Sequence, residues 1–333
     1  MPDVPVTVAV DAMGGDHAPE VVLEGVRAAL ASDPALRIAL VGPPAVVDGA
    51  ASDRCTPVHA GEVIGMDEHP ASAVRSKKDS SIVVGCRLVR DDQAGGFFSA
   101  GSTGACMAAA TLIMGRARGV TRPAIAAIIP TPDRPTVLLD VGANADAKPE
   151  MLLQFGIMGA AYARAVLGVA EPSVGLLNIG EEAAKGSQLA QEAHALMAAS
   201  LPGFIGNVEG RDVPAGAADV VVTDGFTGNV VLKTMEGLAR VLFSQVRDAL
   251  SSGTVTRLAA AVVAPSIRSL RSRLDPESYG GAPLLGVDGA CIIGHGSSSA
   301  RAVANGIAVT ARAVRADLPS VIARRIEQTG VDV

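Results

Sequence analysis

Aromatic residues are scarce in this sequence of 333 residues: they make up 2% of it, and tryptophan is absent. The formal net charge at pH 7 is −6. Proteins that bind nucleic acids usually combine basic stripes with stacking aromatic rings, so this composition argues against a nucleic-acid partner. Only four cysteines occur, widely separated and without a Cys-x-x-Cys pair, which predicts reduced core thiols rather than a zinc site or a disulfide framework.

Long hydrophobic runs are also missing. Hydrophobic residues make up 49% of the chain and the mean hydropathy is +0.35, but the richest apolar run, residues 105–114, is half of the ~20 residues needed to span a bilayer. Asp3, Asp11 and Asp16 interrupt the first segment, which therefore does not resemble a signal peptide. We expect a cytoplasmic protein.

Three catalytic motifs are absent. There is no G-x-x-x-x-G-K-[ST] loop for ATP, no G-x-G-x-x-G loop for dinucleotides and no G-x-S-x-G nucleophile elbow, although His295 and Ser297 are close in sequence. The spacing of Asp11, Asp16, His17 and Glu20 is not diagnostic of a metal site. We predict no metal, no cofactor and no covalent serine intermediate.

What the chain does have is an alternation of short β-rich runs, glycine-containing turns and segments of helical periodicity. This alternation predicts an α/β fold with a parallel-rich sheet and helices on both faces. The predicted strands are residues 6–10, 37–41, 96–100, 124–129, 136–141, 174–179, 219–223 and 290–293. The predicted helices are residues 19–31, 103–114, 149–166, 187–199, 228–250 and 297–315. Because no repeat or flexible linker is visible, we expect residues 1–333 to form a single catalytic unit.

Residues 251–275 depart from this pattern. They predict an apolar helix at 258–264, a break at Pro265 and a second helix whose apolar residues recur at i, i+3 and i+7. Residues 251–274 contain arginines but no acidic residue, which makes a basic island in an acidic protein. We expect a protruding helical pair here.

Five predicted strand-to-helix turns are rich in glycine and small polar residues: residues 11–16, 99–104, 140–144, 224–229 and 294–298. A parallel sheet is expected to bring all five to one edge. Glycine lets backbone N–H groups approach a ligand, and helix N-termini favour anions, so this cluster suits phosphate. The alternative is that each turn is an ordinary strand-to-helix connection of an α/β fold and binds no ligand.

A further turn follows the strand predicted at 174–179 and includes Asn178 and Lys185. Lys185 is suited to meet an anion as a mobile point charge. The alternative is that Lys185 pairs with Glu181 and Glu182 on a solvated helical turn.

Together these segments resemble the PlsX-type phosphate acyltransferases, in order and over nearly the whole chain. The resemblance is carried by Val10-Asp-Ala-Met-Gly-Gly-Asp-His17, Arg75-Ser-Lys-Lys-Asp-Ser-Ser81, Leu139-Asp-Val-Gly-Ala-Asn144, Gly175-Leu-Leu-Asn-Ile-Gly-Glu-Glu182, Asn207-Val-Glu-Gly210, Asp224-Gly-Phe-Thr-Gly-Asn229, Tyr279-Gly-Gly-Ala-Pro-Leu-Leu-Gly286 and Ile293-Gly-His-Gly-Ser297. One departure is Ser102, where the family usually has asparagine.

The resemblance implies transfer of a fatty acyl group from acyl-acyl carrier protein to inorganic phosphate, which forms acyl phosphate for phospholipid synthesis. It further implies the fold of isocitrate dehydrogenases and phosphotransacetylases, a homodimer, peripheral membrane contact and a functional link to the membrane glycerol-3-phosphate acyltransferase. An acyl-coenzyme A phosphotransacylase, a nicotinamide-dependent dehydrogenase and a non-catalytic scaffold are the alternatives.

The site residues are assigned on this basis. Residues predicted to be catalytic are Lys185, Asp224, Asn229 and His295. Residues predicted to bind phosphate or substrate are Gly14, Gly15, Gly101, Ser102, Thr103, Asn144, Asn178, Thr227, Gly228, Gly296 and Ser297. Residues predicted to contact the carrier protein or the membrane are Val262, Val263, Arg268, Arg271 and Arg273. The alternative for the last set is a dimer interface in which the arginines pair with carboxylates of a second copy.

Overall fold

A single mixed sheet runs through the protein in a computed structural model that describes residues 4–253, 256, 260, 262–265 and 276–329. Across the sheet the strand order is β3-β2-β1-β4-β11-β10-β5-β6-β9-β7-β8. The strands are β1 (Val6–Asp11), β2 (Leu36–Gly42), β3 (Cys55–His59), β4 (Gly96–Ser99), β5 (Ala124–Ile129), β6 (Thr136–Leu139), β7 (Val174–Asn178), β8 (Phe204–Glu209), β9 (Val220–Val222), β10 (Ala282–Leu285) and β11 (Ala290–Ile293).

The sheet consists of two parallel sets of strands that run in opposite directions. Strands β3, β2, β1, β4 and β11 are parallel to one another, and so are β6, β9, β7 and β8. Between the sets, β10 is antiparallel to β11 and β5, and β5 is antiparallel to β6. Residues 130–135, which join β5 to β6, are too few for a crossover helix, so this pair forms a hairpin and the direction reverses.

The prediction that all five glycine-rich turns meet at one edge is therefore wrong. The turns after β1, β4 and β11 lie at one edge of the sheet, and the turns after β6, β9 and β7 lie at the opposite edge.

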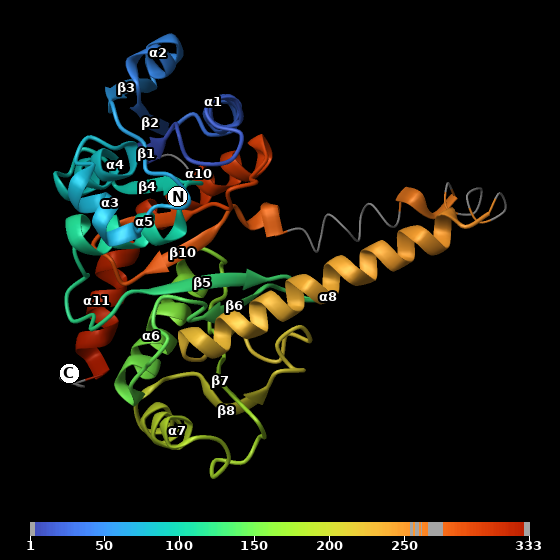
Figure 1. Ribbon diagram of the computed structural model, residues 1–333. Helices are drawn as coiled ribbons and strands as arrows, with labels where there is room; N and C mark the ends of the chain where they lie inside the picture. The colour runs from blue at the N-terminus through green and yellow to red at the C-terminus, as the bar shows by residue number, and fades with distance from the viewer. Residues whose placement is uncertain (1–3, 254–255, 257–259, 261, 266–275, 330–333) are drawn as a thin grey trace.

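Helices cover both faces, which confirms the predicted fold class (Figure 1). On one face, α1, α6, α7, α10 and α11 pack against the sheet, and on the other face α4, α5 and the first part of α8 do so. The helices are α1 (Glu20–Ser32), α2 (Pro44–Val47), α3 (Pro70–Ser76), α4 (Ser81–Arg90), α5 (Thr103–Ala109), α6 (Pro149–Ala165), α7 (Gln188–Ser200), α8 (Gly225–Ser251), α10 (Ala300–Arg315) and α11 (Leu318–Thr329).

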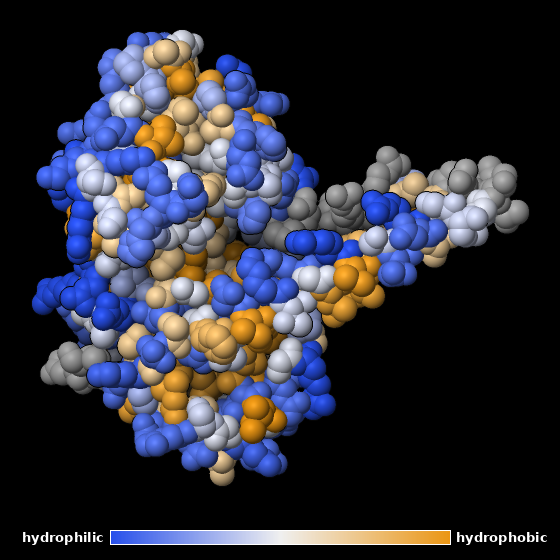
Figure 2. Space-filling model, in the orientation of Figure 1, coloured by the Kyte–Doolittle hydropathy of each residue, from blue (hydrophilic) through white to orange (hydrophobic). Residues whose placement is uncertain are grey.

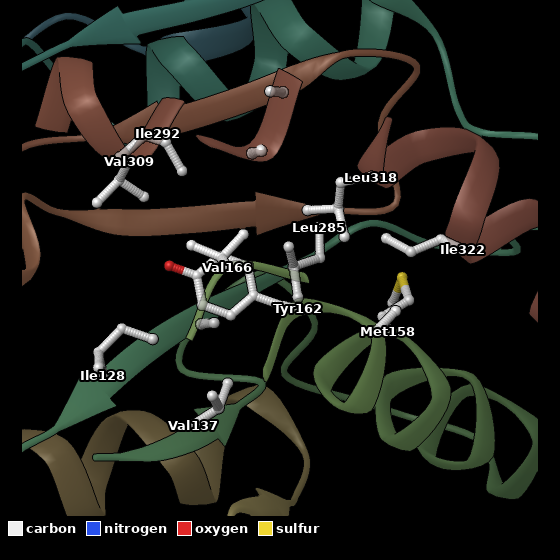
Figure 3. Packing of buried hydrophobic residues seen from close by; sticks show 14 of the residues in the cluster. Ile128, Val137, Met158, Tyr162, Val166, Leu285, Ile292, Val309, Leu318 and Ile322 are labelled. Carbon is white, nitrogen blue, oxygen red and sulfur yellow. The ribbon is translucent and has the colours of Figure 1, made fainter. Parts of the chain in front are cut away.

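The first of these faces holds the larger core. Tyr162 of α6 is 1% exposed and lies among side chains from the sheet and α6 (Figure 3). Ile128 and Val137 approach it from the β5–β6 hairpin, and Leu285 from β10. This core joins the two parallel sets, because its residues come from strands on both sides of the reversal.

Helix α8 is different from the other helices. Its 27 residues make it about 40 Å long, and it projects from the body (Figure 1). Only Gly225 and Gly228 of α8 are fully buried. Large apolar side chains gather on its projecting part (Figure 2), where the exposed ones are Leu238, Val241, Leu242, Phe243 and Val246.

Most of the predicted helical pair at 251–275, including Arg268, Arg271 and Arg273, lies outside the described residues. Val262 and Val263 are described and exposed. Among the described helices, we find none that is both long and apolar enough to cross a bilayer.

Candidate active site

Three turns form the first loop group: residues 11–16 after β1, 99–104 after β4 and 294–298 after β11. The Ser99 hydroxyl donates a hydrogen bond to Asp11 Oδ2 at 2.7 Å and accepts one from the Gly101 N–H at 3.0 Å. The Asp16 N–H donates to the carbonyl of Gly296 at 2.7 Å, which joins the first turn to the third. Gly14 is packed tightly here, because a Cβ at this position would lie 2.7 Å from Gly101 N.

Asp11 is the buried centre of this group. Asp11 is 1% exposed, and its carboxylate interacts with the hydroxyls of Ser81 and Ser99 and with the N–H of Met13. Burial raises the pKa of the Asp11 carboxyl, while these hydrogen bonds oppose the rise. Asp11 therefore organises the backbone of the turns and is not presented to a ligand.

His295 is exposed on the third turn of the first loop group. The Ser297 N–H donates to His295 Nδ1 at 3.2 Å, and the Ser297 hydroxyl lies 2.8 Å from the same nitrogen. Because Nδ1 accepts a hydrogen bond, the neutral ring carries its proton on Nε2. His295 can thus act as a hydrogen-bond donor through Nε2.

The second loop group consists of residues 140–144 after β6, 178–187 after β7 and 224–229 after β9. Its buried centre is Asp140, whose carboxylate accepts hydrogen bonds from the N–H groups of Ile125, Gly142, Ala143 and Asn144 and from the Asn144 side chain. Burial raises the pKa of Asp140, and this set of donors opposes the rise. Asp140 thus holds the backbone of its turn in place, as Asp11 does in the first loop group.

Several residues predicted to be catalytic or to bind substrate build this second group. Asp224 caps α8, since Oδ1 accepts from the Thr227 N–H at 2.8 Å and Oδ2 from the Thr227 hydroxyl at 2.7 Å. The Asn229 amide donates to the carbonyl of Val141 at 2.9 Å, which ties α8 to the turn after β6. Gly228 packs directly on the Asp140 carbonyl.

Lys185 is exposed on the turn that follows β7. The Asn178 amide donates to the Lys185 carbonyl at 3.0 Å and accepts from the Ile179 N–H at 2.8 Å, so both its polar atoms shape the turn. Within the described part of the chain, no ion pair joins Lys185 to Glu181 or Glu182. The solvated ion-pair alternative is therefore not seen, and the ammonium group is available to an anion.

The structure thus distributes the predicted site residues over two places. The first loop group holds Gly14, Gly15, Gly101, Ser102, Thr103, His295, Gly296 and Ser297. The second holds Asn144, Asn178, Lys185, Asp224, Thr227, Gly228 and Asn229. Ser102 acts as the N-cap of α5, where its hydroxyl accepts from the Ala105 N–H. No hydrogen bond or ion pair between described residues links the two groups.

Sequence reasoning did not single out the two buried aspartates or Asn207 as separate site residues. For Asp11 and Asp140 the signal was present, because each is a carboxylate at the end of a buried strand and at the start of a glycine-rich turn. For Asn207, whose amide donates to the Glu182 carbonyl at 2.9 Å, no local pattern indicated the contact.

Comparison with known proteins identifies the family. The sequence model described as "Fatty acid synthesis protein" matches residues 6–321. The chain belongs to that family. A phosphate acyltransferase of Heliobacterium modesticaldum is 49% identical over 326 residues, which cover 96% of this chain and 97% of that protein. A phosphate acyltransferase of Thermobifida fusca is 48% identical over 314 residues, which cover 91% of this chain and 86% of that protein. The resemblance to the PlsX-type phosphate acyltransferases is confirmed.

Solved structures show the same fold at low sequence identity. A phosphotransacetylase from Streptococcus pyogenes aligns with a TM-score of 0.61 at 16% identity, covering 94% of this chain and 96% of that one. A branched-chain phosphotransacylase from Enterococcus faecalis aligns with a TM-score of 0.59 at 15% identity, covering 93% and 99%. These likenesses confirm the predicted phosphotransacetylase-like fold of the family member described here.

Proposed function

We propose that the protein transfers a fatty acyl group from acyl-acyl carrier protein to inorganic phosphate, giving the acyl phosphate used in phospholipid synthesis. The observation that carries this proposal is the match to curated phosphate acyltransferases over nearly the full length of both chains. The geometry supports it, because Lys185 is an available cation on a turn whose backbone is held by side-chain amides.

The reaction needs little acid–base chemistry. Phosphate is already an anionic nucleophile near neutral pH, so positioning and charge stabilisation are the main requirements. A phosphate oxygen attacks the thioester carbonyl carbon, the carbon–sulfur bond breaks, and the thiolate leaves. In this scheme Lys185 holds phosphate, and the Asn229 amide of the same loop group stabilises the developing negative charge. His295 lies in the first loop group at the opposite edge of the sheet, so its Nε2–H is the corresponding donor for an alternative site in that group.

Asp224 is partly buried and caps α8, which makes it a positioning residue in this scheme. Its carboxylate fixes the start of α8 through Thr227, and that helix start carries Asn229. The orientation of the Asn229 amide then follows from Asp224 through the backbone.

We further propose that the protein is a cytoplasmic homodimer with peripheral membrane contact and a functional link to the membrane glycerol-3-phosphate acyltransferase. A second copy would cover the exposed apolar residues of α8, and Val262 and Val263 are apolar residues suited to shallow insertion among headgroups. Val262→Asp should reduce co-sedimentation with anionic liposomes while sparing the dimer. Loss of the dimer without any wild-type liposome binding would argue for the interface alternative.

The proposed activity is tested by incubating the protein with long-chain acyl-acyl carrier protein and radiolabelled phosphate and searching for labelled acyl phosphate. Parallel reactions with acyl-coenzyme A separate the carrier-protein reaction from that of a coenzyme A phosphotransacylase. Arg271→Glu should raise the KM for acyl carrier protein, which is acidic, with little change in the KM for phosphate. Folded protein that forms no acyl phosphate from either donor would overturn the assignment.

A further inference from the structure

The turn that carries Lys185 is held by two side-chain amides from outside the turn. Asn207 of β8 donates from Nδ2 to the Glu182 carbonyl at 2.9 Å. Gln191 of α7 donates from Nε2 to the Ala184 carbonyl at 2.9 Å. Gln191 Nε2 also donates to the Gly186 carbonyl, at 3.3 Å. These bonds fix the backbone on both sides of Lys185 to a strand and to a helix. The turn is therefore positioned by two rigid elements of the fold.

We propose that Asn207 and Gln191 are positioning residues for Lys185. The inference rests on the proposed role of Lys185 in holding phosphate and names the groups that make this role possible. The Lys185 N–H donates to the Glu182 carbonyl at 3.0 Å, and this is the same carbonyl that accepts from Asn207. Asn207 therefore holds the carbonyl that fixes the backbone of Lys185. A lysine whose backbone is fixed in this way presents its ammonium group to an anion from a defined position.

The Asn207 side chain is unfavourable for the stability of the fold. The residue is 7% exposed, and its Oδ1 atom is buried and accepts no hydrogen bond from the described residues. The orientation of the amide is settled by the Glu182 carbonyl, which can only accept, so Nδ2 must face it. An unsatisfied buried acceptor costs about 1–3 kcal/mol, and an apolar side chain of the same size would avoid this cost. An amide at this position is thus poor for stability and useful for holding the turn.

The chain offers a matched control on the same helix. Gln188 is also an exposed glutamine of α7, but its Nε2 bonds to Glu192 Oε1 and not to the turn. Gln191→Met and Gln188→Met therefore make the same chemical change one helical turn apart, and only the first removes a hydrogen bond to the Lys185 turn. Asn207→Leu makes the corresponding nearly isosteric change in β8.

The experiment measures steady-state kinetics, the melting temperature, and the shift in melting temperature that inorganic phosphate induces. Asn207→Leu should raise the KM for phosphate about 10-fold, since small misplacements of a binding group are costly, without lowering the melting temperature. Gln191→Met should have a smaller effect in the same direction, and Gln188→Met none.

The decisive comparison is the cycle of Lys185→Ala, Asn207→Leu and the double variant. If Asn207 acts through Lys185, Asn207→Leu should add little to the loss in phosphate binding that Lys185→Ala causes. Additive effects, or wild-type phosphate binding in both Asn207→Leu and Gln191→Met, would overturn the positioning proposal. An unchanged phosphate-induced shift in Lys185→Ala would instead refute the proposed role of Lys185, and failure of the wild type to form acyl phosphate would refute the proposed function.

Discussion

The two loop groups are built alike around a buried aspartate but present different chemistry. Asp11 and Asp140 each follow a buried strand, accept hydrogen bonds from the turn that follows and have a pKa raised by burial. The turns of the first group carry no lysine or arginine, whereas the second group has Lys185. The glycine-rich turns of the two groups therefore share a construction, and the exposed side chains on them decide their chemistry.

The largest expected effect follows from adding one methyl group to the second loop group. A Cβ at position 228 would lie 1.9 Å from the Asp140 carbonyl oxygen, so Gly228→Ala must displace α8 from the turn. We expect a loss of about 3 kcal/mol or more in the free energy of unfolding, measured with urea. Gly237→Ala is the control, because nothing lies within 4 Å of a Cβ there, and it should be neutral or stabilising by up to ~1 kcal/mol. Equal stability of the two variants would contradict the packing of Gly228 on Asp140.

Removing the cation of the second loop group should come next in size. Lys185→Ala should lower kcat/KM for phosphate about 10²-fold with no loss of melting temperature, because its ammonium group is exposed and would act on bound phosphate and the transition state. Lys233→Ala, which removes an exposed lysine of α8 that pairs with Glu236, serves as the control and should leave the rate unchanged. Wild-type turnover of Lys185→Ala would return Lys185 to the role of an ordinary surface residue.

The corresponding change in the first loop group should be smaller. His295→Ala tests the alternative site in the first loop group and should reduce kcat by no more than about 10-fold, less than the ~10² or more lost with a preorganised oxyanion donor, because water competes at an exposed ring. Ser297→Ala keeps the backbone N–H that bonds to His295 Nδ1 and should cost less. Saturation kinetics with both substrates would check this order, which fails if Ser297→Ala is the more damaging change.

The smallest effect is a dependence of stability on pH. Because burial raises the pKa of Asp11, folding favours the protonated carboxyl. Its contribution is fully present below the pKa of the unfolded chain and is lost as pH rises through the raised folded pKa. Asp11→Asn cannot ionise, so its stability relative to the wild type should increase as pH rises across that interval. Urea unfolding of both proteins over a series of pH values tests this, and parallel curves would show that ionisation of Asp11 is not coupled to folding.

The sequence was sufficient for the strands that lie inside the sheet, with the exception of β10. The strand predicted at 124–129 is found at the same residues, and all the other predicted strands are present within two residues of their predicted ends. The strands that were missed are β3, β8 and β10. Of these, β3 and β8 are the two edge strands and are less fully buried, and β3 and β10 contain Pro57 and Pro283, so none has a continuous hydrophobic run.

The site, like the sheet, could be predicted from the sequence only in part. The turns could be predicted because glycine and small polar residues follow each strand directly, a local property of the sequence. The partners of the side chains could not, because they depend on segments far apart along the chain. Asn229 bonds to Val141, and Asn207 to Glu182. Strand direction was missed for a related reason, since hydrophobic runs give no indication whether the next strand returns by a hairpin or a crossover helix.

The pairing of β4 with β11 has a consequence for synthesis on the ribosome. The second parallel set is formed by residues 136–222 without interruption, so it can assemble as soon as this stretch has emerged. The first set cannot, because β11 and α10, which pack on β4 and α1, are translated near the end of the chain. Until then the edge of β4 has no partner on that side. We therefore expect nascent chains halted before residue 280 to depend on chaperones, and a circular permutant that places residues 276–329 ahead of β1 to fold with less delay.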